Sequence, residues 1–392
     1  MASTPEPAGA SAPEAVLEAP TAPAVIDAAP STQAAAADDT THAPPPAAIS
    51  PAATAATPAP PTTPIVTDPD IQAANDEDDF DDDEFDPQEV DNLSVGASTS
   101  INSSVYEHHY ENGRRYHAYK NARYPIPNDD IEQNREDMKH ALMLELTDGK
   151  LLFSPIGEYP QKIIDIGTGT GIWAIDVADQ YPSAEVLGID FTPIQPVWVP
   201  PNLRFIVDDI EQEWLNGSNF DLIHARQLFP VVKNPAKILD EAYKNLKPGG
   251  WIEVQELGGT AYSDDNSLPD DYSISKFLDL CTEALSKFGS DFRAGNKMEA
   301  PLRAAGFVNV TVRKLKVPIG TWPRDKRLRL IGLYFRTIME AMLPAFGAKP
   351  FLALGMSPVE IEVFLAQARK DLKDNKFHAY FEYLFWTAQK PE

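Results

Sequence analysis

Residues 162–180 constrain the fold of this chain more than any other stretch. A short apolar run, KIIDI, leads into the glycine-rich segment GTGTG, and IWAIDVADQ follows with the apolar spacing of a helix. Glycines adopt backbone angles that other residues avoid, and they let a ligand approach the main chain closely. The sequence therefore predicts a strand, a glycine turn and a helix whose free N–H groups point toward a ligand.

The remainder of the central region repeats this alternation of strand and helix. Apolar runs of strand type lie at residues 185–189, 203–207, 220–224 and 251–254, and a helical pattern lies at 236–246. Strands that alternate with helices predict an α/β fold with a mostly parallel, doubly wound sheet.

Three further helices are expected outside this region. Acidic residues at the start of 128–148 predict a capped helix. The stretches 325–346 and 357–372 have amphipathic spacing. These two helices either cap the expected ligand pocket at the glycine turn or cover the sheet.

The residues around the glycine turn narrow the choice of ligand. A dinucleotide fingerprint would require a third glycine at position 172, where the chain has Ile172, and no Gly-Lys-Ser/Thr follows for a P-loop. Asp165 would repel a pyrophosphate but would attract the ammonium group of an amino acid. This favours S-adenosylmethionine over a nicotinamide dinucleotide.

Two more acidic positions follow the next two predicted strands. Asp190 ends the second strand, where a carboxylate can accept hydrogen bonds from both ribose hydroxyls. Asp208 and Asp209 follow the third strand, where a carboxylate can accept from the adenine amino group while the N–H of Ile210 donates to the ring. Each acid alone is typical of a surface turn, but together at the strand ends they predict a nucleoside site.

Composition separates an N-terminal tail from the rest. The first 95 residues contain 19 of the 59 acidic side chains and no Lys or Arg, within Ala-, Pro- and Thr-rich repeats. Such a segment buries too little apolar surface to fold, so we expect residues 1–95 to be disordered and 96–392 to form the folded domain. The acidic run at 76–86 is either a solvated linker or a docking motif for a basic partner.

Composition also excludes several classes of protein. A single Cys281 argues against disulfide scaffolds and cysteine-based zinc sites, and no metal is expected. The net charge of -26 argues against direct nucleic-acid binding. No apolar run is long enough for a membrane span. Cytoplasm and nucleus both remain open as locations.

Residues 162–256 resemble a class I S-adenosylmethionine-dependent methyltransferase. The segments that carry this resemblance are IIDIGTGTG, GID, FIVDDI, FDLIHAR and LKPGGWIEVQE. More narrowly, YENGRRYHAYK (110–120), YPIPNDDIEQNREDMKHAL (124–142) and DDIEQEW (208–214) are similar to the fungal LaeA-like methyltransferases, which include regulators of secondary metabolism and development. The resemblance implies a Rossmann-like seven-stranded sheet whose last strand is antiparallel, with residues 377–388 as the candidate for that strand.

The resemblance also implies roles for individual residues. Gly167, Thr168, Gly169 and Gly171 would form the floor of the cofactor site, while Asp165 would orient the methionine end. Asp190 would hold the ribose, and Asp208 or Asp209, with Ile210, would meet the adenine.

On the methyl-transfer side we expect Arg226 and His224, and His224 is either catalytic or a structural histidine. Tyr110, Arg114, Arg115, Tyr116 and His117 either fold over the cofactor as a lid or pack elsewhere. An oxygen nucleophile would need a general base, for which His117, His140 and His224 are the candidates.

Two functions follow from these expectations. The first is a methyltransferase that acts on a small secondary metabolite or on a protein. The alternative is a regulatory protein that keeps the methyltransferase fold and acts by binding partners such as velvet-type transcriptional regulators.

Overall fold

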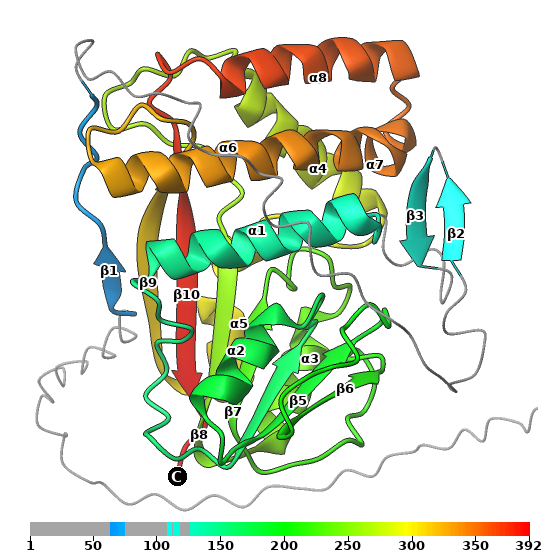
Figure 1. Cartoon of the computed structure of the whole chain (residues 1–392), viewed down its shortest axis with the longest axis vertical. Coiled ribbons are helices and arrows are strands. Elements are labelled where there is room, and N and C mark those ends of the chain that lie inside the picture. Colours follow the sequence, from blue (N-terminus) through cyan, green and yellow to red (C-terminus); the bar gives the residue numbers. More distant parts are fainter. Residues whose placement is uncertain (1–62, 75–107, 112, 118–125) are drawn as a thin grey trace, which may run out of the picture. The chain divides into compact units, whose positions relative to one another are not determined.

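The central sheet has eight strands in the order β1-β9-β10-β8-β7-β4-β5-β6 (Figure 1). A computed structural model describes residues 63–74, 108–111, 113–117 and 126–392. The strands are β1 (Ile65–Thr67), β4 (Lys162–Ile166), β5 (Glu185–Asp190), β6 (Leu203–Val207), β7 (Phe220–Arg226), β8 (Leu246–Leu257), β9 (Val308–Pro318) and β10 (Tyr380–Gln389). Strands β6, β5, β4, β7 and β8 are parallel, whereas β10 is antiparallel to both β8 and β9. The expected doubly wound, mostly parallel sheet is confirmed.

The middle strands are apolar because helices cover the sheet on both faces. On one face, α2 (Ile172–Gln180) packs Trp173, Ala174 and Val177 against β4 and β5. On the other face, α3 (Pro235–Asn245) and α5 (Glu299–Ala304) pack against the sheet. A short 3₁₀ helix, η4 (Ala294–Lys297), precedes α5.

A second group of helices lies beyond the carboxyl ends of the parallel strands (Figure 1). It contains α1 (Asp130–Leu146), α4 (Ser273–Lys287), α6 (Lys326–Gly347), α7 (Lys349–Ala353) and α8 (Pro358–Leu372). These helices share an apolar cluster with β9 and β10. The C-terminal half of α1 is anchored there through Leu142, Met143 and Leu146, and its N-terminal half extends toward the strand ends.

Two features of the sheet differ from the expectations. The sheet has one strand more than the resemblance implied, because Ile65–Thr67 pairs in parallel with β9. This strand falls inside the segment that we expected to be disordered, so the boundary at residue 95 is wrong for residues 63–74. The last strand is antiparallel as expected, but it begins at Tyr380 rather than at residue 377.

A separate two-stranded hairpin precedes α1. It consists of β2 (His108–Glu111) and β3 (Arg114–His117). Arg114 pairs with Asp129, the N-cap of α1, at 2.5 Å, and Arg115 donates to the backbone oxygen of Asn128. The hairpin thus contacts the start of α1.

The chain divides into Met1–Ala59 and Pro60–Glu392, and every described residue lies in the second unit. The repeats before residue 63 and the acidic run at 76–86 lie outside the described residues. In the described part, no helix has both the length and the apolarity to cross a lipid bilayer.

Candidate cofactor site

A cleft lies between the carboxyl ends of β4 to β7 and the N-terminal half of α1. It is lined by residues of the glycine turn, the strand ends and the helix: Pro127, Asn128, Glu132, Gln133, Glu136, Gly167, Gly169, Thr170, Asp190, Phe191, Thr192, Ile194, Asp208, Ile210, Glu211, Arg226, Gln227, Leu228, Val231 and Val232. Ligands of open α/β sheets bind at this edge. The sequence predicted the turn and the strand ends but not the contribution of α1.

The three glycines of the turn have different surroundings. Gly167 and Gly169 line the cleft with φ of +70° and +59°, and a Cβ on Gly169 would meet no atom within 4 Å. Gly171 is buried at the start of α2, where a Cβ would lie 2.4 Å from the ring of Phe205. A Cβ on Gly167 would lie 2.8 Å from the Leu228 side chain. Gly169 therefore leaves open space at the cleft, whereas Gly167 and Gly171 leave space for Leu228 and Phe205.

Asp165, Thr168 and His224 form a buried cluster behind the turn. One carboxylate oxygen of Asp165 accepts from the Thr168 hydroxyl at 2.6 Å, and the other lies 2.7 Å from Nδ1 of His224. The His224 ring stacks on Trp173 with centroids 3.5 Å apart. None of the three cluster residues lines the cleft.

The structure places His224 behind the glycine turn and not among the residues that line the cleft. Its side chain is fully buried, because the β7 position that carries it points toward α2 rather than toward the strand end. Nδ1 contacts Asp165 and the ring face contacts Trp173, whereas Nε2 has no hydrogen-bond partner in the described part of the chain.

Asp190 lies at the end of β5 and lines the cleft. Its carboxylate accepts from the N–H of Gly169 at 2.9 Å and from both the N–H and the hydroxyl of Thr192. Burial raises the pKa of Asp190, although these hydrogen bonds oppose the shift. The carboxylate is therefore held rigidly beside the glycine turn.

The two acids after β6 lie on different sides of the chain. Asp208 lines the cleft and accepts from Asn216 at 2.6 Å and from the N–H of Asp209. Asp209 is buried and accepts from the N–H of Glu211 within the turn. Of the two alternatives, Asp208 is placed to contact a ligand, together with Ile210.

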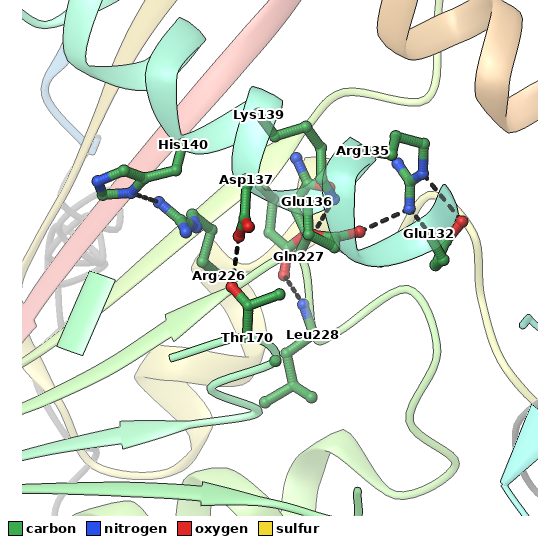
Figure 2. A network of polar contacts seen from close by, with 12 residues as sticks. Glu132, Arg135, Glu136, Asp137, Lys139, His140, Thr170, Arg226, Gln227 and Leu228 are labelled. Atoms are coloured by element: carbon green, nitrogen blue, oxygen red, sulfur yellow. Dashed lines mark hydrogen bonds and ion pairs between the residues drawn. The ribbon is translucent and has the colours of Figure 1, made fainter. Parts of the chain in front are cut away.

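Figure 2 shows side chains of α1 that point toward the glycine turn and the end of β7. Asp137 accepts from the Thr170 hydroxyl at 2.7 Å, and Lys139 donates to Gln227. His140 lies 2.9 Å from the Arg226 guanidinium through Nδ1. These polar contacts join the helix to the cleft, and periodicity could not reveal them because it identifies faces of a helix rather than their partners.

The segment that we expected either to fold over the cofactor or to pack elsewhere forms the β2–β3 hairpin. Tyr110 is exposed, Tyr116 is buried, and none of the described side chains of the hairpin lines the cleft. The side chain of His117 lies outside what the structure describes. The first turns of α1 cover the site in place of this hairpin.

Comparisons with known proteins show the family to which the chain is similar. The family model described as a methyltransferase domain matches residues 135–312. Methyltransferase pytC of Aspergillus terreus is 38% identical over 295 residues, which cover 75% of this chain and 91% of that protein. The secondary metabolism regulator LAE1 of Cochliobolus heterostrophus is 35% identical over 290 residues, covering 72% of this chain and 94% of the regulator.

One further relative and one solved structure are also similar to this chain. The secondary metabolism regulator laeA of Aspergillus fumigatus is 31% identical over 307 residues, covering 76% of this chain and 81% of that protein. Among solved structures, phosphoethanolamine N-methyltransferase 2 of Haemonchus contortus, in complex with S-adenosyl-L-methionine, has a TM-score of 0.37 and 16% identity over 65% of this chain and 53% of that one. On the sequence identities, the chain belongs to the LaeA-like family of S-adenosylmethionine-dependent methyltransferases.

Proposed function

We propose that this methyltransferase binds S-adenosylmethionine in the cleft under α1 and acts in, or regulates, secondary metabolism. One observation carries the site assignment: Asp190 and Asp208 follow successive parallel strands and line the same cleft as Gly167 and Gly169. The metabolic role is supported by the names of two groups of relatives, a methyltransferase and regulators of secondary metabolism.

The residues fit the ligand that the family uses. Gly167 and Gly169 would form the floor, Asp190 would hold the ribose hydroxyls, and Asp208 with Ile210 would contact the adenine. Thr168 would stabilise the turn through Asp165, since both are buried behind the cleft. Acidic side chains around the cleft also suit a cationic sulfonium.

When bound, S-adenosylmethionine supplies an electrophilic methyl group. The protein then has to align the acceptor and exclude water. No histidine side chain among the described residues lines the cleft. Positioning therefore has better structural support than base catalysis by His140 or His224.

The site assignment is tested by calorimetric titration of the whole chain with S-adenosylmethionine and S-adenosylhomocysteine. Asp190→Ala should weaken the binding of both by at least about tenfold, because it removes hydrogen bonds to a buried ribose. Asp279→Ala, on the surface of α4, is the matched control. Unchanged affinity in Asp190→Ala would refute the ribose assignment.

The second candidate is regulation through partner binding in the nucleus. The relatives named as secondary metabolism regulators support a regulatory role. The partner would be a protein such as a velvet-type regulator, and the acidic run at 76–86 would contribute to its binding. Purification from the native cell, with and without residues 76–86, tests this candidate. A nuclear partner lost with those residues would support it, and a monomer in both preparations would argue against it.

A further inference from the structure

The cleft is lined by carboxylates and a single cation. Its acidic side chains are Glu132, Glu136, Asp190, Asp208 and Glu211. Within the described part of the chain, Arg226 is the one cationic side chain among the lining residues. Glu132 and Glu136 are ion-paired with Arg135, and Glu136 also with Lys139. Among the lining residues, Arg226 is the cation that can bind a ligand carboxylate.

Arg226 is held in place from outside the cleft (Figure 2). One of its guanidinium nitrogens, Nη1, lies 2.9 Å from Nδ1 of His140, and Nε2 of His140 lies 2.8 Å from a carboxylate oxygen of Asp176. Arginine only donates, so Nδ1 must accept and Nε2–H must donate to Asp176. The chain Asp176–His140–Arg226 thus selects one neutral tautomer of the histidine.

The surroundings of His140 keep it in that state. The side chain is nearly fully buried, and burial lowers its pKa, although the Asp176 hydrogen bond opposes this. The charged groups that face it are Arg226 on β7, Asp176 on α2 and Asp137 on α1. A protonated ring would lose the acceptor and repel Arg226.

We infer, on the basis of the proposed cofactor site, that Arg226 binds the carboxylate of the amino-acid part of S-adenosylmethionine. His140 and Asp176 are positioning residues that aim the guanidinium. His140 lies on α1 and Asp176 on α2, and neither residue contacts the ligand itself.

Two ligands that differ only in this carboxylate test the inference. S-adenosylhomocysteine and its decarboxylated form are titrated into the whole chain by calorimetry. Arg226→Gln should weaken the affinity for S-adenosylhomocysteine by about tenfold or more. The affinity for the decarboxylated ligand should remain nearly unchanged. Equal losses for both ligands, or no loss for either, would overturn the inference while leaving the proposed site in place.

Two substitutions of the histidine test the positioning role. His140→Asn keeps an acceptor near the place of Nδ1, whereas His140→Gln keeps a donor near the place of Nε2 and loses the acceptor for Arg226. The asparagine variant should preserve the preference for the carboxylated ligand, and the glutamine variant should reduce it several-fold. His378→Gln, remote from the cleft and paired with Asp265, is the control.

These measurements distinguish the positioning role of His140 from the proposed cofactor site. If both His140 variants preferred the carboxylated ligand over the decarboxylated one to the same degree, the positioning role would be overturned. A folded wild-type chain that binds neither ligand would overturn the proposed function and the inference together.

Discussion

Whether a side chain reaches the cleft depends on its position along a buried strand. His224 and Arg226 lie two residues apart on β7, yet the first is fully buried against Trp173 and the second lines the cleft at the strand end. The strand pattern placed both near the ligand but could not separate them, because every residue of β7 before Arg226 is buried. The distinction depends on α2, whose Trp173 occupies the space in front of His224.

For His224 we therefore predict a loss of stability rather than of chemistry. His224→Ala removes a stacked ring and leaves Asp165 buried without this partner, which should lower the free energy of unfolding by about 2–4 kcal/mol. Urea denaturation measures this loss. A variant of full stability with reduced turnover would restore a catalytic role.

A second prediction separates the glycines of the turn. Gly171 has a φ of +85°, and a Cβ at this position would collide with the ring of Phe205. Gly171→Ala should therefore destabilise the fold by about 2–4 kcal/mol. Gly169→Ala should cost only about 1 kcal/mol of strain but should lose cofactor affinity, because its methyl group projects into open space at the cleft. Thermal denaturation and calorimetry on both variants compare these effects. Similar losses of stability in the two would contradict the assignment.

At the level of elements, the sequence predicted those strands and helices that have a clear local pattern of apolar residues. The strand at 162–166, the helix at 172–180 and the acidic residues at the strand ends were all recognisable. Strand β1 was not, because its pairing with β9 joins Ile65 to Val312 and the surrounding composition is Pro-rich. Pairing between such distant segments leaves no periodic signal in either one.

The segment 63–74 gives an element-level prediction. It covers the edge of β9 through β1 and continues with hydrogen bonds from Lys316 to Asp68, from Arg324 to Gln72 and from Ala74 to Trp322. A chain lacking residues 1–74 should lose about 1–3 kcal/mol of stability and should self-associate, because the strand edge becomes free. A chain lacking residues 1–62 is the control. Equal melting temperatures and monomers for both chains would show that the segment does not protect the edge.

At the scale of the whole molecule, the apolar core also contains buried acidic side chains. Glu256 on β8 is fully buried, and one of its oxygens accepts from the N–H groups of Leu228 and Phe229 at 3.0 Å each. The other oxygen has no hydrogen-bond partner in the described part of the chain. Burial raises the pKa of Glu256 to about 8, so the group is protonated in the folded protein at neutral pH. Charge patterning in the sequence could not identify it, because its burial comes from the packing of the β7–α3 loop and η4 against β8.

This carboxyl makes the stability of the whole molecule depend on pH. The unfolded chain releases the Glu256 proton above its ordinary pKa of 4.5, whereas the folded chain retains it up to about pH 8, so stability should fall as pH rises between these values. Glu256→Gln keeps the acceptor for the two N–H groups and has no such proton. Its free energy of unfolding, relative to wild type, should rise by about 3 kcal/mol from pH 5 to pH 8 in urea titrations. Glu283→Gln, exposed on α4, should show no pH-dependent difference, and a constant difference for Glu256→Gln would mean that Glu256 is ionised in the folded protein.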